Sequence, residues 1–351
     1  MNKYYTRACN FYYGKNSKTN IKNKISIPLN GNNFISFDKI EIIKRNGSKI
    51  IDFKSINKLS KNLKIKINKD LKNIKKKKTF KQLDLSNVPI LMGIVNLTPD
   101  SFSDGGKYNN RNLAIKHINN LLSSGARIID VGGESTRPGA NDINPKKEWD
   151  RIKLVLKFLK NSKCIISLDT RKSFVMEKAS KLKIDLINDV SGLNYDTKTV
   201  QFLKKTKKPF IIHHMQGTPK NMQKKPLYKN VILDIYDFFE EKLKYLRKKG
   251  IRHNNIILDP GIGFGKNLKH NMSLIHNISI FHSLGFPILV GNSRKRFIKD
   301  LSGKNDSKSR IGGTIASSIY LMMQGVQILR IHDVNEVTQS LKIFKKIMDN
   351  G

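Results

Sequence analysis

The stretch LMGIVNLTPDSFSDGG, residues 91–106, decides the fold, because it joins a short apolar run to a polar loop that ends in two glycines. The apolar run extends from Ile90 to Val95, and its length and composition are typical of a fully buried strand. Asn96 then ends the run with a side-chain amide. Proteins that alternate strands with helices present their chemistry at strand ends in this way. On its own, the stretch fits a strand followed by a tight turn equally well.

The same pattern recurs seven more times toward the C-terminus. The eight apolar runs cover residues 90–95, 126–131, 164–168, 184–187, 209–212, 256–258, 287–290 and 327–329. Short apolar strands that alternate with helices imply parallel pairing with both faces of the sheet buried. Eight such units predict an α/β protein whose strands close into a (β/α)8 TIM barrel rather than an open sheet. In that fold the active site lies at the carboxyl ends of the strands.

Composition narrows the class of protein. The chain has 351 residues, of which 38% are hydrophobic, enough for one large core and an appendage. No apolar run approaches the ~18–20 residues of a membrane span, so we expect no membrane partner. The two cysteines offer neither a disulfide framework nor a metal cluster. With no targeting pattern at the N-terminus, these features favour a cytoplasmic location.

The formal net charge of +40 requires a separate interpretation. Such a charge often indicates a nucleic-acid or membrane-surface partner. Here the excess is mostly Lys, accompanied by many Asn and Ile residues, as in proteins from AT-rich genomes, and it is scattered along the expected helices. We therefore expect no specific nucleic-acid partner, but salt-sensitive, non-specific binding to polyanions.

Residues 1–85 differ from the barrel region, which we place at residues 86–351. They are rich in Lys, Asn and Tyr and poor in large apolar side chains. We expect a basic, weakly structured N-terminal extension of unknown role, with short strands and a possible helix. The strands are expected over residues 25–29 and 34–43, the helix over residues 56–71, and an exposed linker at the four lysines 75–78.

Polar side chains follow the apolar runs and would meet at the mouth of the barrel. Asp169, Asn188 and Asp259 supply carboxylates and an amide that match a planar, nitrogen-rich heterocycle such as a pterin or a purine. Met215 is placed to lie against the face of such a ring. Each residue alone fits a helix cap or a strand-end hydrogen bond equally well, but three around one mouth favour a ligand site.

A second group of side chains is cationic or donates hydrogen bonds. It comprises Arg137, Lys295, Arg330 and His332. Arginine forks suit phosphate oxygens. Asn96 would stand beside them if the first strand neighbours the eighth, and there it could help to hold Mg2+ on a diphosphate. No Ser or Cys has the setting of a nucleophile. These residues therefore indicate a substitution reaction with a diphosphate leaving group.

Over roughly residues 88–350 the sequence resembles the dihydropteroate synthase family, the target of sulfonamides. The matching stretches are GIVNLTPDSFSDGG, IIDVGGESTRPGA, SLDTRK, INDVSGL, HMQGTP, LDPGIGFGK, VGNSRKRFI and ILRIHDV. The resemblance implies a transferase of folate biosynthesis that joins 6-hydroxymethyl-7,8-dihydropterin diphosphate to p-aminobenzoate, releases diphosphate and needs Mg2+. It also adds to the expectation of a homodimer, the commonest closed oligomer.

The resemblance also implies roles for individual residues. The pterin pocket falls on Asp169, Asn188, Met215, Asp259 and Lys295. The diphosphate region falls on Asn96, Arg137, Arg330 and His332, and Asn96 would be the metal ligand. The p-aminobenzoate pocket falls on Thr136, Arg137, Pro138, Phe264 and Lys295. Asp259, Lys295, Arg330 and His332 would be catalytic, and the loops 98–109 and 134–141 would close over the substrates. This sequence departs from the family at Arg296, where Ser is common, so sulfonamide contacts do not transfer to that position.

Two other functions fit parts of this pattern. One is a pterin-dependent methyltransferase, which needs the pterin pocket but neither a diphosphate site nor the ESTRPGA and SRK loops. The other is a catalytically lapsed barrel that binds a pterin or a polyanion, with the basic extension contacting the partner. The presence of both loops and of almost every expected site residue favours the synthase.

Overall fold

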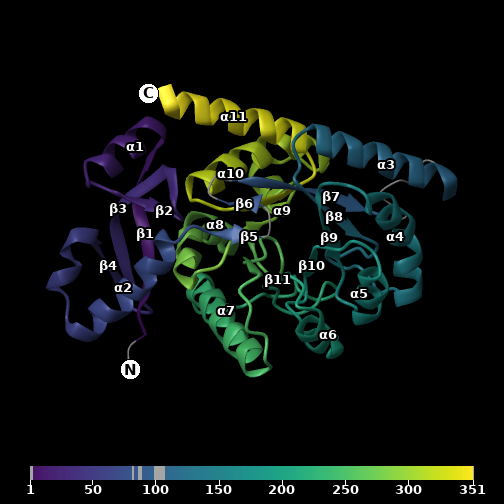
Figure 1. The fold of residues 1–351 in the computed structure, drawn as a ribbon, viewed down its shortest axis with the longest axis horizontal. Helices are drawn as coiled ribbons and strands as arrows, with labels where there is room; N and C mark the ends of the chain where they lie inside the picture. Colours follow the sequence, from purple (N-terminus) through teal and green to yellow (C-terminus); the bar gives the residue numbers. More distant parts are fainter. Residues whose placement is uncertain (1–2, 81–82, 86–88, 99–106, 351) are drawn as a thin grey trace.

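The structure, a computed structural model, describes residues 3–80, 83–85, 89–98 and 107–350. A smaller N-terminal sheet packs against one side of a barrel, and the C-terminal helix runs along the top of both in Figure 1. The expected α/β barrel with a strand-containing N-terminal extension is therefore confirmed.

Eight parallel strands form the barrel. They are β7 (Ile90–Asn96), β8 (Ile128–Gly132), β9 (Ile165–Asp169), β10 (Leu186–Asp189), β11 (Phe210–His213), β12 (Ile256–Asp259), β13 (Leu289–Val290) and β14 (Ile328–Ile331). Hydrogen bonding runs from β12 through β11, β10, β9, β8, β7 and β14 to β13. A bridge between Leu258 and Ile288 then joins the two ends of the sheet and closes the barrel.

Helices follow the strands and cover the outside of the barrel (Figure 1). They are α3 (Lys107–Ser123), α4 (Pro145–Leu159), α5 (Ser173–Ser180), α6 (Lys198–Thr206), α7 (Val231–Lys248), α8 (Leu268–His276), the 3-10 helix η3 (Ile278–Leu284), α9 (Arg296–Ser302), the 3-10 helix η4 (Lys308–Arg310), α10 (Ile311–Met323) and α11 (Val334–Asn350). Asn144, Asn230 and Asn267 begin α4, α7 and α8, and each side chain caps the first turn of its helix.

The alternation of side chains along each strand places polar groups above an apolar floor. The floor takes one or two buried apolar residues from every barrel strand, and Phe80 and Leu85 close it from below. Side chains two positions apart share one face of a strand, so the residue two places after each floor residue also points inward. At this level six strands carry a polar residue: Asp130, Ser167, Asn188, His213, Asp259 and Arg330.

The extension is more ordered than the sequence predicts. It comprises β1 (Tyr5–Tyr13), α1 (Gly14–Lys22), β2 (Ile27–Leu29), β3 (Asn32–Lys44), β4 (Gly47–Asp52), the 3-10 helix η1 (Phe53–Lys58), α2 (Lys61–Lys75) and the hairpin strands β5 (Thr79–Phe80) and β6 (Leu83–Asp84). The long β3 pairs antiparallel with β1 along one edge, and with β2 and β4 along the other. Isoleucine, leucine and phenylalanine side chains give this sheet its own core, so the expectation of a weakly structured extension is wrong.

The extension is fastened to α7 by a cluster of charges. Asp237 of α7 accepts a hydrogen bond from the Tyr5 hydroxyl at 3.0 Å and pairs with Lys3 at 2.5 Å and Arg45 at 2.6 Å. The Tyr5 ring meets the ring of Tyr236 edge-on, with centroids 5.1 Å apart. Elsewhere β1 and α2 pack against η3, and α1 packs against α11.

Two local expectations are corrected. The helix expected over residues 56–71 covers residues 61–75 instead, and residues 53–58 form a separate 3-10 helix whose first turn is capped by the Asp52 side chain. The last lysine of the expected exposed linker, Lys78, is buried, and its Nζ donates to the carbonyl of Asn73 at 2.6 Å.

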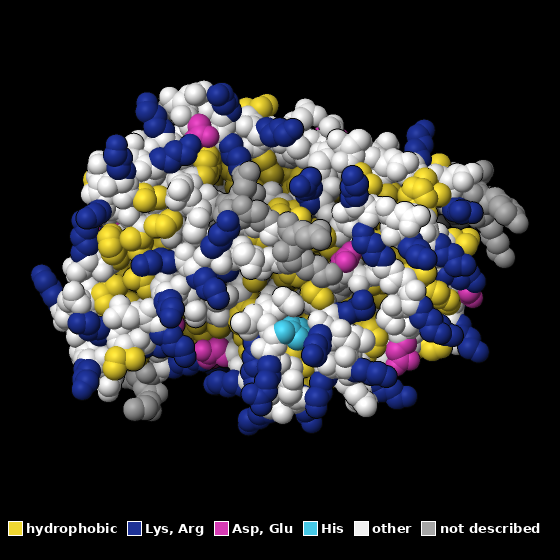
Figure 2. Space-filling model, in the orientation of Figure 1, with side chains coloured by type: hydrophobic (Ala, Val, Ile, Leu, Met, Phe, Trp, Pro, Cys, Tyr) yellow, Lys and Arg dark blue, Asp and Glu magenta, His cyan; other side chains and the backbone are white. Residues whose placement is uncertain are grey.

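The charge of the molecule is dispersed over the face drawn in Figure 2. Lys and Arg side chains spread over both the extension and the barrel there, with few acidic side chains between them. Among the residues that the structure describes, no helix combines the length and the apolar character needed to cross a membrane.

Candidate active site

A cavity of about 480 Å3 opens at the carboxyl ends of the barrel strands. Eight of the predicted site residues line it: Asn96, Thr136, Arg137, Pro138, Phe264, Lys295, Arg330 and His332. The other four do not line it. Of these, Asp169, Asn188 and Asp259 are buried at the ends of their strands, and Met215 is half-buried just beyond β11. The loop of residues 98–109, which we expect to close over the substrates, falls largely outside the described residues.

Arg330 links the cavity to the buried acids behind it. Its Nε donates to Asp130 Oδ2 at 2.6 Å, and its Nη2 donates to Asp169 Oδ2 at 2.9 Å. Asn188 Nδ2 donates to the same oxygen of Asp130 at 3.1 Å. Burial and the neighbouring Asp130 raise the pKa of Asp169 above its ordinary value, although Arg330 opposes them. Four strands thus bring two carboxylates, an amide and a guanidinium together.

Asp259 is a third buried acid, at the end of β12. Its Oδ1 accepts the backbone N–H of Gly261 at 2.8 Å. Burial raises the pKa of Asp259 to about 6, against the Gly261 N–H and the attraction of Lys295. His213 stands 3.9 Å away, and burial keeps the pKa of this histidine well below its ordinary value. Asp259 therefore faces a neutral imidazole on that side.

Lys295 and Phe264 form one wall of the cavity. Lys295 Nζ lies 4.1 Å from the centroid of the Phe264 ring, a cation–π distance. Burial and the nearby Arg330 lower the pKa of Lys295 to about 8. The backbone before Phe264 requires glycine at position 261, where φ is +70° and a Cβ atom would lie 2.0 Å from the carbonyl oxygen of His214.

His332 and Arg137 are the remaining polar groups of the predicted diphosphate region. His332 Nδ1 lies 3.0 Å from the Ser293 hydroxyl, and burial together with Arg330 lowers the pKa of this histidine to about 3. His332 is therefore neutral and can offer a hydrogen bond but no positive charge. Arg137 lies on the exposed loop after β8.

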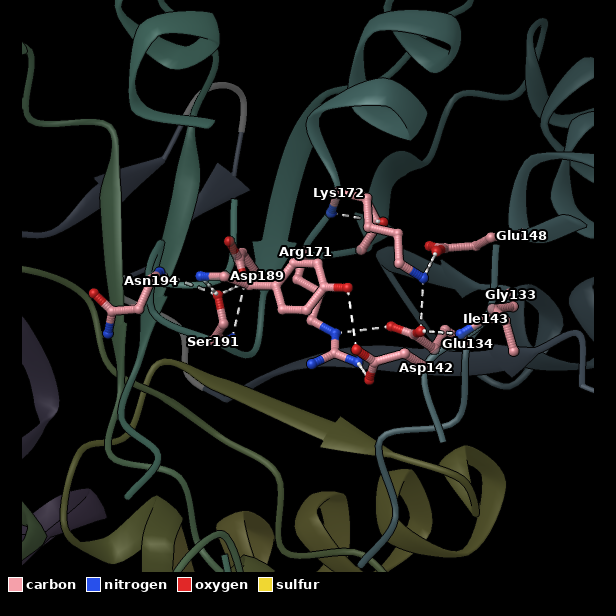
Figure 3. A network of polar contacts seen from close by, with 12 residues as sticks. Gly133, Glu134, Asp142, Ile143, Glu148, Arg171, Lys172, Asp189, Ser191 and Asn194 are labelled. Carbon is pink, nitrogen blue, oxygen red and sulfur yellow. Dashed lines mark hydrogen bonds and ion pairs between the residues drawn. The ribbon is translucent and has the colours of Figure 1, made fainter. Parts of the chain in front are cut away.

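A buried ionic network behind this loop escaped the sequence analysis (Figure 3). Glu134, which lines the cavity, pairs with Arg171 at 2.9 Å and with Lys172 at 2.6 Å. Lys172 also pairs with Glu148 of α4 at 2.8 Å. The motifs GGEST and SLDTRK contain Glu134, Arg171 and Lys172, and Glu148 lies outside both, so nothing in their spacing predicts that the four residues meet.

This fold and this site define a pterin-binding enzyme. The chain belongs to that family: the family model described as "Pterin binding enzyme" matches residues 92–332.

Within the family, the chain is similar to dihydropteroate synthases. The enzyme of Neisseria meningitidis serogroup C is 41% identical over 262 residues, which is 74% of this chain and 93% of the relative. A Yersinia pestis dihydropteroate synthase solved with a sulfonamide drug is 41% identical, with a TM-score of 0.71 over 76% of this chain and 96% of that one. A Xanthomonas albilineans dihydropteroate synthase solved with 7,8-dihydropteroate is 31% identical, with a TM-score of 0.68 over 76% and 95% of the two chains. The expected family is confirmed.

Proposed function

We propose that this chain is a dihydropteroate synthase, a transferase of folate biosynthesis. It joins 6-hydroxymethyl-7,8-dihydropterin diphosphate to p-aminobenzoate and yields 7,8-dihydropteroate and diphosphate. The observation that carries the proposal is the set of buried acids at three strand ends behind a cavity lined by cations. The family relationship supports the same reaction.

The pterin ring is proposed to bind against the buried polar groups. Asp169, Asn188 and Asp259 accept and donate hydrogen bonds to its nitrogen-rich edge. Arg330 already occupies Asp169 Oδ2 in the free chain, so pterin binding shares or displaces that contact. Asp130 keeps its own hydrogen bond from Arg330 Nε, which would hold the guanidinium at the mouth. Lys295 borders the ring on the cavity side, and Met215 is assigned to its face.

The leaving diphosphate is proposed to lie among Asn96, Arg137, Arg330 and His332. Within the described residues no group of three or more His, Cys, Asp or Glu is placed to hold a metal ion. The residues of the proposed diphosphate site fit Mg2+ that would be held mainly by phosphate oxygens and water. The amide oxygen of Asn96 would be its ligand from the protein. When bound, Mg2+ supplies positive charge that stabilises the leaving diphosphate.

The amine of p-aminobenzoate is proposed to attack the exocyclic methylene carbon of the pterin. A C–N bond forms, the C–O bond breaks, and the electron pair leaves with the diphosphate. The amine is already neutral, so it needs no strong base, and it loses its proton after the bond has formed. Thr136, Arg137, Pro138, Phe264 and Lys295 would position the aromatic ring. Arg137 and Arg330 would stabilise the charge that grows on the leaving group.

Three further features are proposed. The homodimer rests on the family resemblance and on the frequency of two-fold dimers. The cytoplasmic location rests on composition, including two cysteines that offer no disulfide framework. The division into an extension over residues 1–85 and a barrel over residues 86–351 rests on the change of composition and on the separate core of the extension.

The test is product formation by the purified full-length chain. Incubation with the pterin diphosphate, p-aminobenzoate and Mg2+ should yield dihydropteroate and an equal amount of diphosphate, measured by chromatography and by a phosphate assay. Without p-aminobenzoate, no pteroate should form. If a folded protein binds pterin but forms no pteroate, the synthase assignment is wrong and the lapsed barrel takes its place.

A further inference from the structure

The loop that carries Thr136, Arg137 and Pro138 has both of its ends attached to one guanidinium. The loop leaves β8 at Glu134 and reaches α4 through Asp142. Arg171, from the end of the neighbouring β9, donates from Nε to Glu134 Oε2 at 2.9 Å and from Nη2 to Asp142 Oδ1 at 2.5 Å. The side chains of Arg171 and Glu134 are each 3% exposed, whereas that of Asp142 is 58% exposed. One buried cation thus spans the base of an exposed loop.

Further contacts hold this arrangement in place (Figure 3). The Tyr195 hydroxyl donates to Asp142 Oδ2 at 3.1 Å, and its ring lies 4.1 Å from the guanidinium carbon of Arg171. Glu134 Oε1 accepts the backbone N–H of Ile143, the residue after Asp142, at 3.1 Å. Arg171 therefore has a carboxylate at each end of the loop and an aromatic ring against its face.

The middle of the loop lies beyond these contacts and is held by backbone hydrogen bonds. Ala140 N–H donates to the carbonyl of Arg137, and Gly139 N–H donates to the carbonyl of Pro219 in another loop, both at 3.0 Å. Arg137 itself is exposed. Its placement at the cavity therefore depends on how firmly the two ends of the loop are fixed.

We propose that Arg171 is a positioning residue, which holds the loop 135–141 in the conformation that binds p-aminobenzoate. This inference rests on the proposed function, because it assigns the loop to the second substrate. Asn188 and Asp259 end other strands, and Asp169, although it ends the same strand as Arg171, is bonded to Arg330 and not to the loop. Loosening the loop should therefore weaken p-aminobenzoate binding and turnover while pterin binding is kept.

The network permits variants that fold. In an Arg171→Lys variant the shorter, single ammonium reaches one of the two carboxylates at most, while Lys172 keeps Glu134 paired. Asp142→Ala removes the exposed end of the bridge and leaves no buried charge without a partner. Asp150→Ala is the matched control: Asp150 is an exposed aspartate of α4, 60% exposed and paired with Lys153 at 2.6 Å, outside the loop.

Steady-state kinetics and binding separate positioning from a general structural role. We expect Arg171→Lys and Asp142→Ala to raise KM for p-aminobenzoate by on the order of tenfold. The Kd of pterin-6-carboxylic acid, measured by calorimetry, should stay within about twofold of the wild-type value. The double variant should be no worse than Arg171→Lys alone, because both changes break one bridge. Asp150→Ala should match the wild type.

Amide hydrogen exchange decides the inference without reference to activity. Exchange in residues 135–141 should accelerate in both variants, while exchange in β9 and β10 stays unchanged. If the wild type makes no pteroate but the loop exchanges faster in the variants, the proposed function fails and the role of Arg171 in holding the loop stands. Unchanged exchange in this loop, or an equal loss of pterin binding and p-aminobenzoate binding, overturns the inference.

Discussion

Replacing Asp259 by Asn should make the folded protein more stable while it removes pterin binding. Burial raises the pKa of Asp259 from 3.8 to about 6. Between about pH 4 and pH 6 the folded chain therefore holds a proton that the unfolded chain has released, so this group costs stability as the pH rises. Above pH 6 the full cost is present. Asn has no such cost and keeps an oxygen for the Gly261 N–H.

The magnitude follows from the two pKa values. They differ by about two pH units, which corresponds to about 3 kcal/mol in the free energy of unfolding at pH 7. The attraction of the carboxylate for Lys295 and Lys266 is already contained in this shift. The figure is an upper limit, because the buried amide of Asn brings N–H groups that must find hydrogen-bond partners of their own. We expect a net gain of roughly 1–2 kcal/mol, or about 1–3 °C in Tm for a chain of this length. The gain should shrink as the pH is lowered toward 4.

Thermal unfolding of both proteins at several pH values, with pterin binding measured by calorimetry, checks this prediction. Asp189→Asn is the matched control, because burial raises the pKa of Asp189 to about 6 as well. Its carboxylate accepts hydrogen bonds from the backbone N–H and the hydroxyl of Ser191, and it is not assigned to the pterin site. The control should bind pterin normally. A lower Tm of Asp259→Asn at pH 7 would refute the account of burial, and retained pterin binding would refute the role assigned to the carboxylate.

Three shorter predictions concern the fold and the site. A chain that begins at Asn87 should aggregate or unfold in a solubility and circular-dichroism test, because it lacks the floor residue Phe80 and the side chains packed on η3 and α7. In a pH–rate profile, kcat/KM should fall below about pH 6 as Asp259 is protonated and above about pH 8 as Lys295 loses its charge. Gly261→Ala should lower Tm and abolish activity, because its Cβ would lie 2.0 Å from the His214 carbonyl oxygen.

The barrel was predictable because its strands read as short apolar runs, each ending in a polar side chain. The period of two along a strand then fixes which polar side chains face inward. Ile128 and Asp130 share one face of β8, as Ile257 and Asp259 share one face of β12. The convergence of the strand-end residues follows from parallel pairing alone.

Two of the errors share a physical cause, since in both the packed fold overrides the local sequence. Lysine runs are normally solvated, yet Lys78 is buried and donates to the carbonyl of Asn73 in the last turn of α2. The extension reads as polar because it has no long apolar run. Its sheet nevertheless alternates enough apolar side chains to build a core, and α7 supplies the acid that pairs with Lys3 and Arg45.

Arg171 shows where sequence reasoning stops. Glu134, Asp142 and Tyr195 precede or follow it by 37, 29 and 24 positions in the printed sequence. Together with Arg171 they come from three different strand-to-helix loops, Glu134 and Asp142 from the same one. No periodicity joins such residues, because the packing of neighbouring strand ends alone brings them together. The proposed pterin residues on the strands, such as Asn188 and Asp259, occupy positions that alternation can predict. The residues that hold the substrate loops, such as Arg171, do not occupy such positions, so the structure is needed to find them.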